Sequence, residues 1–405
     1  MTSNVTSCVE IASEKRNAPD AMQEATGTPK GAVRRCIIYI GMPKTGSTSI
    51  QRSLEGFKND RCVYAQLAGE ANHSLPIYSL FSTRPVQHHL HRGRDEASLR
   101  GYIERVQADL KQSIARAANR TLLIAGEDIC SLAPRDVVTM RDYFRADFDQ
   151  VDIVAYVRAP AEFMASSFQE RVKGGILRAV DPLKTYRSYK AAFRKFDDVF
   201  GRDNVRIWKF DPKSFKDGCV VQDFCARLGI PLAKDRITRL NESLSRQAVA
   251  LLYAYFSFQN SDDADRMSAP EAMQFGLQIG GDKFRLSPDV IRSVLNANRA
   301  DIEWMEARLG QSLCEDAETA RPGDVRNEAD LLLPDPGAVM KLLTLLGRHA
   351  PKDVPGKTPQ EIAQLVQIWR ETSKARRREG LPWRLARRFR RLALPQKALA
   401  RPNST

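Results

Sequence analysis

A short apolar run, followed by a glycine-rich loop and a helical pattern, constrains this chain more than any other stretch. The run RCIIYI occupies residues 35–40, the loop GMPKTGST begins at Gly41, and the helical pattern continues to Leu54. A continuous apolar run is typical of a buried parallel strand. A glycine turn between such a strand and a helix lets backbone N–H groups approach an anion, and the helix directs its positive end to the same point. The order of strand, loop and helix therefore predicts a phosphate-binding site.

Further apolar runs alternate with helical patterns along the first half of the chain. The runs lie at 121–125, 151–157 and 204–208, and helical patterns fill 160–173 and 184–200. Such alternation predicts an α/β fold of three layers, in which a central parallel sheet carries helices on both faces. Later in the chain the strand signals fade, which predicts a helical C-terminal part. Its helical patterns cover residues 244–258, 287–309, 336–347 and 358–378.

The net charge of the chain is concentrated near its C-terminal end. Of the formal charge of +14, residues 370–405 contribute 12 basic and 2 acidic side chains, leaving 51 basic and 47 acidic ones for residues 1–369. A nearly neutral body argues against a nucleic-acid groove across the fold. The seven cysteines are scattered without a C-x-x-C pair, so neither a disulfide framework nor a structural zinc site is indicated. Without a leader-like or membrane-spanning apolar segment, these features predict a cytoplasmic protein.

The position of the lysine separates this loop from a nucleoside-triphosphate loop. In the pattern G-x-x-x-x-G-K-[ST] the lysine directly follows the second glycine. Here Ser47 holds that place, and Lys44 lies two residues before Gly46. A lysine at this earlier position can sit beside the bridging oxygen of a bound anhydride, where charge develops as a group departs. A sulfuryl group carries one negative charge and fits such a site without a metal.

The loop IGMPKTGSTSIQ resembles the 5′-phosphosulfate loop of sulfotransferases that use 3′-phosphoadenosine 5′-phosphosulfate (PAPS), especially a bacterial, carbohydrate-type family. That family has a second element, a strand that ends in arginine and a helix with a serine eight residues later. The stretch YVRAPAEFMASSF supplies Arg158 and Ser166 at this interval. The resemblance covers about residues 35–310 and implies PAPS as co-substrate, no required metal and a saccharide acceptor. The implied PAPS-binding residues are Gly41, Pro43, Lys44, Thr45, Gly46, Ser47, Thr48, Arg158 and Ser166, with Lys283 and Arg285 of GGDKFRLS as a looser match.

Two residues are candidates for the general base that removes the proton of the acceptor. Glu127 follows the run TLLIA at the carboxyl edge of the sheet, where open α/β sheets bind ligands. His73, in GEANHSLP, matches an N-H-S pattern of the same family. We favour Glu127 and keep His73 as the alternative; in ordinary structural roles the glutamate would cap a helix and the histidine would bond to backbone. Lys173, on the helix of Ser166, is a candidate contact for an anionic acceptor, with a solvated lysine as the alternative.

The stretch QHHLH at residues 87–91 offers His88, His89 and His91 close together. A zinc site would need further cysteine, histidine or carboxylate ligands at suitable spacing, and none is visible nearby. The sequence therefore predicts no metal site, and the three histidines are interpreted as part of an exposed loop or acceptor cleft.

Four segments are predicted along the chain: a disordered lead at 1–33, the sulfotransferase domain at 34–310, a helical extension at 311–369 and a basic tail at 370–405. Within the tail, residues 382–394 form a basic amphipathic pattern. Such a pattern suits the anionic inner face of a membrane, where lipid-linked glycans are assembled. Packing against the protein's own acidic surface is the alternative interpretation.

These observations predict a cytoplasmic, PAPS-dependent sulfotransferase, peripheral at the membrane, that acts on a hydroxyl or amine of a saccharide or glycolipid. Two other classes stay open. One is a P-loop kinase for a small molecule, with Glu127 or Asp128 as magnesium ligand. The other is a non-catalytic nucleotide-binding scaffold that its basic tail recruits to membranes. The sequence names neither the sugar nor the position sulfated.

Overall fold

The computed structural model describes residues 33–91, 93–176, 185–239, 243–259, 266–314, 319–332, 335–353 and 356–392. For residues 376–392 the description covers the helical backbone. The predicted lead, apart from Val33, and the last part of the predicted tail lie outside these ranges.

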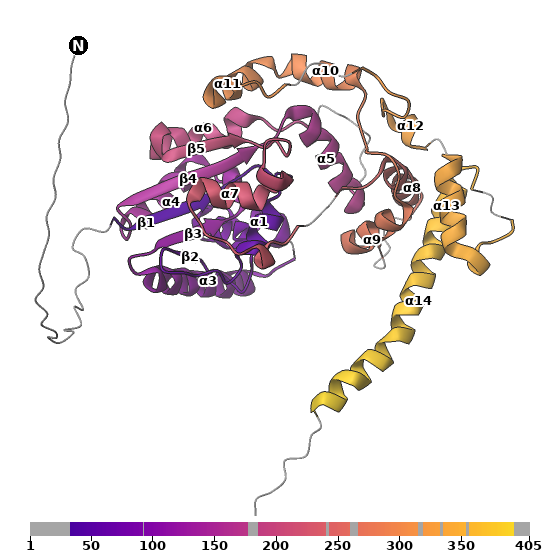
Figure 1. Ribbon diagram of the computed structural model, residues 1–405, viewed down its shortest axis with the longest axis horizontal. Coiled ribbons are helices and arrows are strands. Elements are labelled where there is room, and N and C mark those ends of the chain that lie inside the picture. Colours follow the sequence, from indigo (N-terminus) through magenta and orange to yellow (C-terminus); the bar gives the residue numbers. More distant parts are fainter. Residues whose placement is uncertain are drawn as a thin grey trace, which may run out of the picture.

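Five parallel strands form one sheet in the order β2-β3-β1-β4-β5 (Figure 1). The central strand β1 pairs with β3 on one side and with β4 on the other. The chain therefore changes direction of travel across the sheet at β1, and ligands of open α/β sheets bind outside the carboxyl ends of strands at such a point. The sequence predicted four of the strands but not β2. The bounds are β1 Arg35–Tyr39, β2 Cys62–Tyr64, β3 Thr121–Ala125, β4 Gln150–Val157 and β5 Val205–Lys209.

Helices cover both faces of the sheet. They are α1 Ser47–Leu54, α2 Ser74–Phe81, α3 Glu96–Ala117, α4 Pro134–Arg145, α6 Tyr189–Phe200 and α7 Val220–Leu228. Successive side chains of a strand point to opposite faces. Cys36 and Ile38 accordingly lie in the core with α3, α4 and α6, whereas Ile37 and Tyr39 lie in the core with α1 and α7. This arrangement confirms the predicted three-layer α/β fold.

A second core lies in the helical part that follows. Its helices are α5 Pro160–Lys173, α8 Arg246–Ser257, α9 Ala269–Ile279, α10 Pro288–Ala297, α11 Arg299–Leu309, α12 Glu328–Leu332, α13 Pro336–Leu346 and α14 Pro359–Leu392. Met164, Phe168 and Val172 of α5 pack in this core, with buried residues of α8, α9, α13 and α14. Because α5 also follows β4 directly, it joins the sheet to the helical part.

One predicted helix is divided in two. The sequence pattern at 287–309 predicted a continuous helix, but the chain forms α10 and α11. Asn298 separates them with φ −119°, and its side-chain amide donates a 2.8 Å hydrogen bond to the carbonyl of Val294. An asparagine that bonds to nearby backbone competes with helix continuation, which explains the break.

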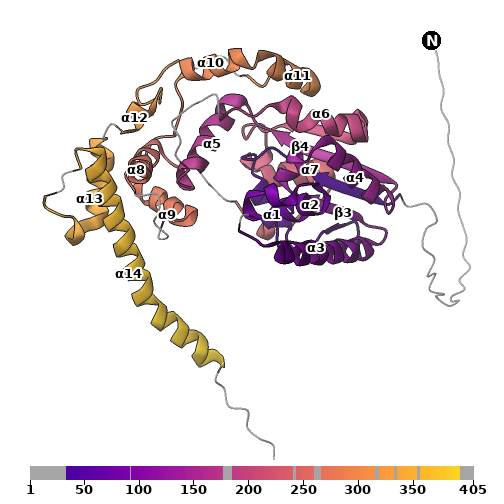
Figure 2. The ribbon, with the colours of Figure 1, turned by 180° about the vertical axis from the view of Figure 1, so that it is seen from behind.

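The last helix, α14, extends away from the rest of the molecule at its C-terminal end in both views (Figures 1 and 2). Its first half is anchored, because Ile362, Leu365, Val366 and Trp369 are buried in the helical core. The helix runs without interruption through residue 370, where the sequence predicted the start of the tail. Among the described helices, none has the combination of length and apolar character that a membrane crossing requires.

Candidate functional site

The loop between β1 and α1 depends on its two glycines. A Cβ at Gly41 would lie 2.1 Å from the hydroxyl oxygen of Tyr39, so a side chain does not fit there. Gly46 has φ 76°, in the left-handed region that favours glycine, and its carbonyl accepts the first hydrogen bond of α1, from the N–H of Ile50. Lys44 also has a positive φ, 67°. A non-glycine residue in this region is uncommon, and such residues cluster at functional sites.

Two hydroxyl groups of the loop, those of Thr45 and Ser47, are bonded to neighbouring groups in the core. The Thr45 hydroxyl donates a 2.6 Å bond to the carbonyl of Met42, and the Tyr39 hydroxyl lies 3.0 Å from Thr45 Oγ1 and 3.1 Å from Ser47 Oγ. Thr45 and Ser47 are therefore buried, and their hydroxyl groups are used within the loop. Thr48 is half-buried. The first N–H groups of α1 are the groups that a helix leaves for an anion.

Lys44 and Lys173 share one carboxylate. Lys44 Nζ lies 3.0 Å and Lys173 Nζ 2.6 Å from the same oxygen, Oε2 of Glu170. Burial alone would raise the pKa of Glu170, but the two ammonium groups outweigh it and hold that pKa below its ordinary value. The predicted residue Lys173 is thus buried and lies beside the loop lysine.

Arg158 connects the loop to α5. Its Nη1 donates a 2.8 Å hydrogen bond to the carbonyl of Lys44, and its Nε donates a 3.1 Å bond to Glu162 Oε2. The arginine follows β4, and β4 is the neighbour of β1, so the sheet itself brings the arginine to the loop. The predicted strand-end arginine and loop lysine are therefore in direct contact.

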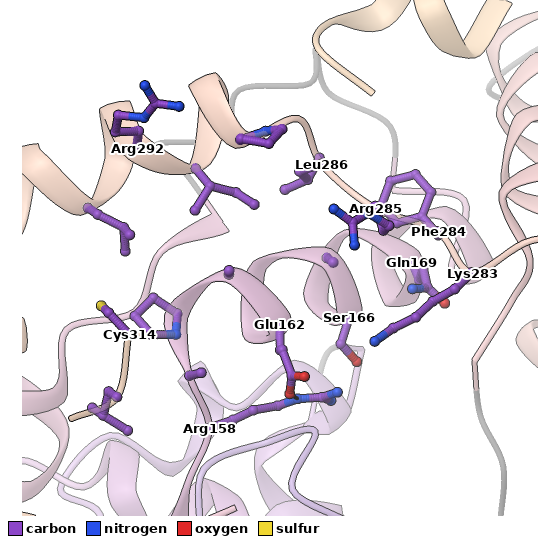
Figure 3. Close-up of a pocket in the computed structure, with 18 of the residues that line it drawn as sticks. Arg158, Glu162, Ser166, Gln169, Lys283, Phe284, Arg285, Leu286, Arg292 and Cys314 are labelled. Atoms are coloured by element: carbon purple, nitrogen blue, oxygen red, sulfur yellow. Dashed lines mark hydrogen bonds and ion pairs between the residues drawn. The ribbon is translucent and has the colours of Figure 1, made fainter. Parts of the chain in front are cut away.

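A pocket of about 310 Å³ lies beside this contact, between α5 and the segment 283–295 (Figure 3). The guanidinium of Arg158, the hydroxyl of Ser166 and the ammonium of Lys283 point toward one another at one side of the pocket. Arg285 also lines it and is held by a 2.9 Å bond from its Nε to Asp324. The structure thus brings together at one pocket the four residues outside the loop that were predicted to bind the nucleotide. The apolar part of the lining includes Pro160, Phe284, Leu286, Ile291, Leu295 and Leu313.

Glu127 lies next to the first helix after the loop. Its carboxylate accepts a 2.7 Å hydrogen bond from Gln51 of α1, and longer ones from Asn72 at 3.3 Å and Ser74 at 3.4 Å. Burial raises the pKa of Glu127, and the donors reduce that rise without cancelling it. The residue is half-buried, so its carboxylate is partly desolvated beside the helix that follows the loop.

His73 lies in the core. It is 0% exposed, and its ring is stacked on Tyr64 with 4.6 Å between centroids. Its Nδ1 accepts a 3.1 Å hydrogen bond from the N–H of Ala125. Burial lowers the pKa of His73 to about 3, so the ring is neutral. This environment matches a histidine bonded to backbone, and it favours Glu127 over His73 as the base.

The histidines of residues 87–91 are mostly buried. His88 is 6% and His91 1% exposed, so the prediction of an exposed loop is wrong for these two and holds for His89. His91 Nε2 lies 2.7 Å from Ser79 Oγ, and His88 Nε2 lies 3.3 Å from Asp128 Oδ2. Asp128 is thus an acidic partner of His88, which the sequence near the histidines did not reveal because the two residues are 40 positions apart.

Sequence reasoning missed three residues that shape the site. Glu162 lies four residues after Arg158 on the same chain segment, and helical spacing could have indicated this pair. Tyr39 is the one hydroxyl-bearing residue in the run RCIIYI, which could have marked it as a support for the loop. Glu170 lies three residues before Lys173, so helical spacing could have indicated that pair. Its contact with Lys44 gave no local signal, because the two residues are 126 positions apart.

The comparisons with known proteins give distant likenesses. Neither a protein-family model nor a curated protein matches the sequence. One similar solved structure is the sulfotransferase domain from the Synechococcus PCC 7002 olefin synthase, with 16% identity, a TM-score of 0.32, and coverage of 61% of this chain and 96% of that domain. Another is the sulfotransferase domain from the curacin biosynthetic pathway, with 12% identity, a TM-score of 0.32, and coverage of 66% and 98%. Likenesses at this level do not bear on activity or substrate.

Proposed function

We propose that this chain is a PAPS-dependent sulfotransferase. The observation that carries the proposal is the double role of Arg158, which holds the loop at Lys44 and lines the pocket beside Ser166 and Lys283. Arg158 thus lies between two positively charged groups, Lys44 of the loop and Lys283 of the pocket. A nucleotide with a 5′-phosphosulfate and a 3′-phosphate would present an anionic group to each.

The residues have separate roles in this proposal. The backbone N–H groups of the loop and of the first turn of α1 hold the 5′-phosphosulfate. Arg158, Ser166 and Lys283 bind the 3′-phosphate, with Arg158 adding charge-assisted hydrogen bonds. The apolar lining of the pocket accommodates the base of the nucleotide.

Transfer then proceeds in one displacement. The acceptor oxygen attacks sulfur in line and forms a new S–O bond, while the bond from sulfur to the bridging oxygen breaks. Glu127 takes the proton of the acceptor, and Lys44 stabilises the charge that develops on the bridging oxygen. Adenosine 3′,5′-bisphosphate leaves with that charge.

The loop geometry weighs against the kinase alternative. A nucleoside-triphosphate loop needs a lysine directly after its second glycine. Here that residue is Ser47, which is 4% exposed and whose hydroxyl is turned into the core toward Tyr39. No cation can reach outer phosphates from this position.

The acceptor is proposed from the resemblance of the loop to carbohydrate-type sulfotransferases. We propose a hydroxyl, or an amine, of a saccharide or glycoconjugate. A cytoplasmic location, with contact to an anionic membrane through residues 382–394, belongs to the same proposal. Residues 382–392 contribute helical backbone to α14, and the side chains that would make this contact lie outside the described part of the chain.

The test has a binding part and a transfer part. Calorimetric titration should show tight binding of adenosine 3′,5′-bisphosphate without metal, and much weaker binding of ATP with magnesium. Preferential binding of ATP with magnesium would favour the kinase instead.

For transfer, radiolabelled PAPS is incubated with fractions of glycans, glycolipids and small molecules. Lys44→Ala should lower turnover more than tenfold while changing nucleotide affinity less, because the lysine interacts most strongly in the transition state. The control is Lys111→Ala, an exposed lysine of α3. Turnover of Lys44→Ala at the wild-type rate would refute the role of this lysine.

A further inference from the structure

Three side chains with metal-ligating atoms meet beside the candidate base. His88 lies between the short helical turns Pro85–Gln87 and His89–His91, and His89 begins the second of them. Asp128 lies in a third such turn, Glu127–Ser131. One ligand atom from each of the three residues lies within 4.8 Å of the others. The two segments are 40 residues apart in the sequence, so the fold creates this cluster.

The distances suit a metal ion. Tetrahedral zinc with bonds of about 2.0–2.1 Å holds neighbouring ligand atoms about 3.3–3.4 Å apart. His88 Nε2 and Asp128 Oδ2 are 3.3 Å apart, which is this separation. The His89 ring lies against the His88 ring, with 4.6 Å between centroids and 24° between planes. The ligand atom of His89 lies within 4.8 Å of the other two, so a rotation of this exposed ring would bring it to the same separation.

Packing fixes the central ligand in place. The side chain of His88 is 5% exposed, and its ring contacts Tyr78 at 5.1 Å and His91 at 6.1 Å between centroids. The side chain of Asp128 is 31% exposed and His89 is exposed, so one side of the cluster is open to solvent. A metal ion could enter from that side and keep water as a further ligand.

We propose that His88, His89 and Asp128 form a binding site for a divalent transition-metal ion. Two imidazole nitrogens and one carboxylate suit zinc, nickel or copper, whereas magnesium and calcium prefer oxygen ligands. Without metal, His88 Nδ1 accepts a 3.3 Å hydrogen bond from the N–H of Leu90, which leaves the ring proton on Nε2, toward Asp128. Metal binding at Nε2 moves this proton to Nδ1 and ends that long contact.

The site has a consequence for the proposed sulfotransferase. Asp128 directly follows Glu127, so an ion held by Asp128 lies close to the carboxylate that takes the proton of the acceptor. Zinc at this site is expected to slow sulfuryl transfer. This part rests on the proposed function, whereas metal binding itself does not.

Equilibrium dialysis tests the site on the full, untagged chain after removal of metals with a chelator. We expect one zinc ion per chain. Asp128→Asn and His89→Ala should each weaken zinc binding at least tenfold, because each removes one of three protein ligands. His89 is exposed, so its substitution leaves the fold intact. The matched control is His349→Ala, an exposed histidine in another part of the chain, which should bind zinc as the wild type does.

Cobalt(II) gives a second readout that does not depend on affinity alone. The wild-type chain should show the strong visible absorption of cobalt in a tetrahedral site, and His89→Ala should lose it. A wild-type chain that binds no zinc, or variants that bind zinc and cobalt like the wild type, would show that His88 and Asp128 form a hydrogen-bonded pair and nothing more. Metal binding without any effect on transfer would leave the site in place and overturn the expected inhibition alone.

Discussion

Two opposing influences act on the carboxylate of Glu127. Burial disfavours its charged form, while Gln51 and Asn72 donate hydrogen bonds that stabilise that form. Burial is the larger influence, so the pKa of Glu127 lies above its ordinary value. The carboxylate of Glu127 therefore holds a proton more strongly than an exposed carboxylate does, and it must lose that proton before it can act as the proposed base.

Glu127→Gln should lower kcat by roughly 10² to 10⁴ because it removes the proton acceptor. In the wild type the base is active when deprotonated, so activity falls as the pH drops through the raised pKa. This acidic limb should lie above the pH expected for an exposed glutamate and should vanish in the variant. The measurement is kcat against pH in a buffer with chelator, alongside calorimetry that should show unchanged affinity for adenosine 3′,5′-bisphosphate. Glu104→Gln, an exposed glutamate of α3, serves as control. If the limb persists in Glu127→Gln, the base is another residue.

The residues that the sequence could predict were those with a local or strand-end signal. Arg158 and Ser166 were predicted from the resemblance to the sulfotransferase family, whose second element is a strand end and a helix at fixed spacing, and both line one pocket. The pair of Lys44 and Glu170 and the pair of His88 and Asp128 were not predicted, because their members lie 126 and 40 residues apart. Such contacts depend on how elements pack, which a local pattern does not contain.

At the scale of elements, α5 was predicted with its observed bounds. Pro160 suits the first helical turn, and the helix ends at a glycine, Gly174. The edge strand β2 was missed because three residues are too few to show a period. The sequence predicted the site elements best where a strand, a turn residue and a helix followed one another directly.

Ser166 on α5 provides a selective test of the pocket. Ser166→Ala should weaken adenosine 3′,5′-bisphosphate about 10- to 100-fold, since a hydrogen bond to a charged group contributes about 1.5–3 kcal/mol. Affinity for adenosine 5′-phosphate should hardly change, because that ligand lacks the 3′-phosphate. Arg158 is less selective, since it also holds the carbonyl of Lys44. Calorimetry with both nucleotides makes the comparison, with Ser167→Ala on the same helix as control. Equal losses for the two ligands would contradict the assignment of Ser166.

At the scale of the whole molecule, stability should depend on the neutral state of His73. Its pKa is about 3 in the fold and near 6.5 in an unfolded chain, because burial disfavours the charged ring. The unfolded state therefore binds more protons between these values, and stability is lost as the pH falls below about 6.5. This one histidine should cost the wild type roughly 2 kcal/mol of unfolding free energy between pH 7 and pH 5.

His73→Asn keeps an acceptor for the N–H of Ala125 and removes the titration. The variant should be less stable than the wild type at pH 7, because it loses the stacking on Tyr64. The difference should shrink by pH 5. Urea unfolding of both proteins at pH 7 and pH 5 measures this difference in stability. The KM for the acceptor should be the same in the variant, because the ring of His73 is buried. A stability difference that is the same at both pH values would mean that His73 does not titrate as proposed.

The 34 residues of α14 make a rod about 50 Å long, since each residue adds 1.5 Å. Its first half is fixed in the helical core, and its other half projects from the molecule (Figure 1). Removing one residue from the projecting half would shorten the rod by about 1.5 Å and rotate its far end by about 100°. Removing seven would shorten it by about 10 Å and leave the far end facing almost the same way. The number of residues removed therefore determines both how far that end extends and which way it faces around the helix axis, and a deletion of seven changes the length almost alone.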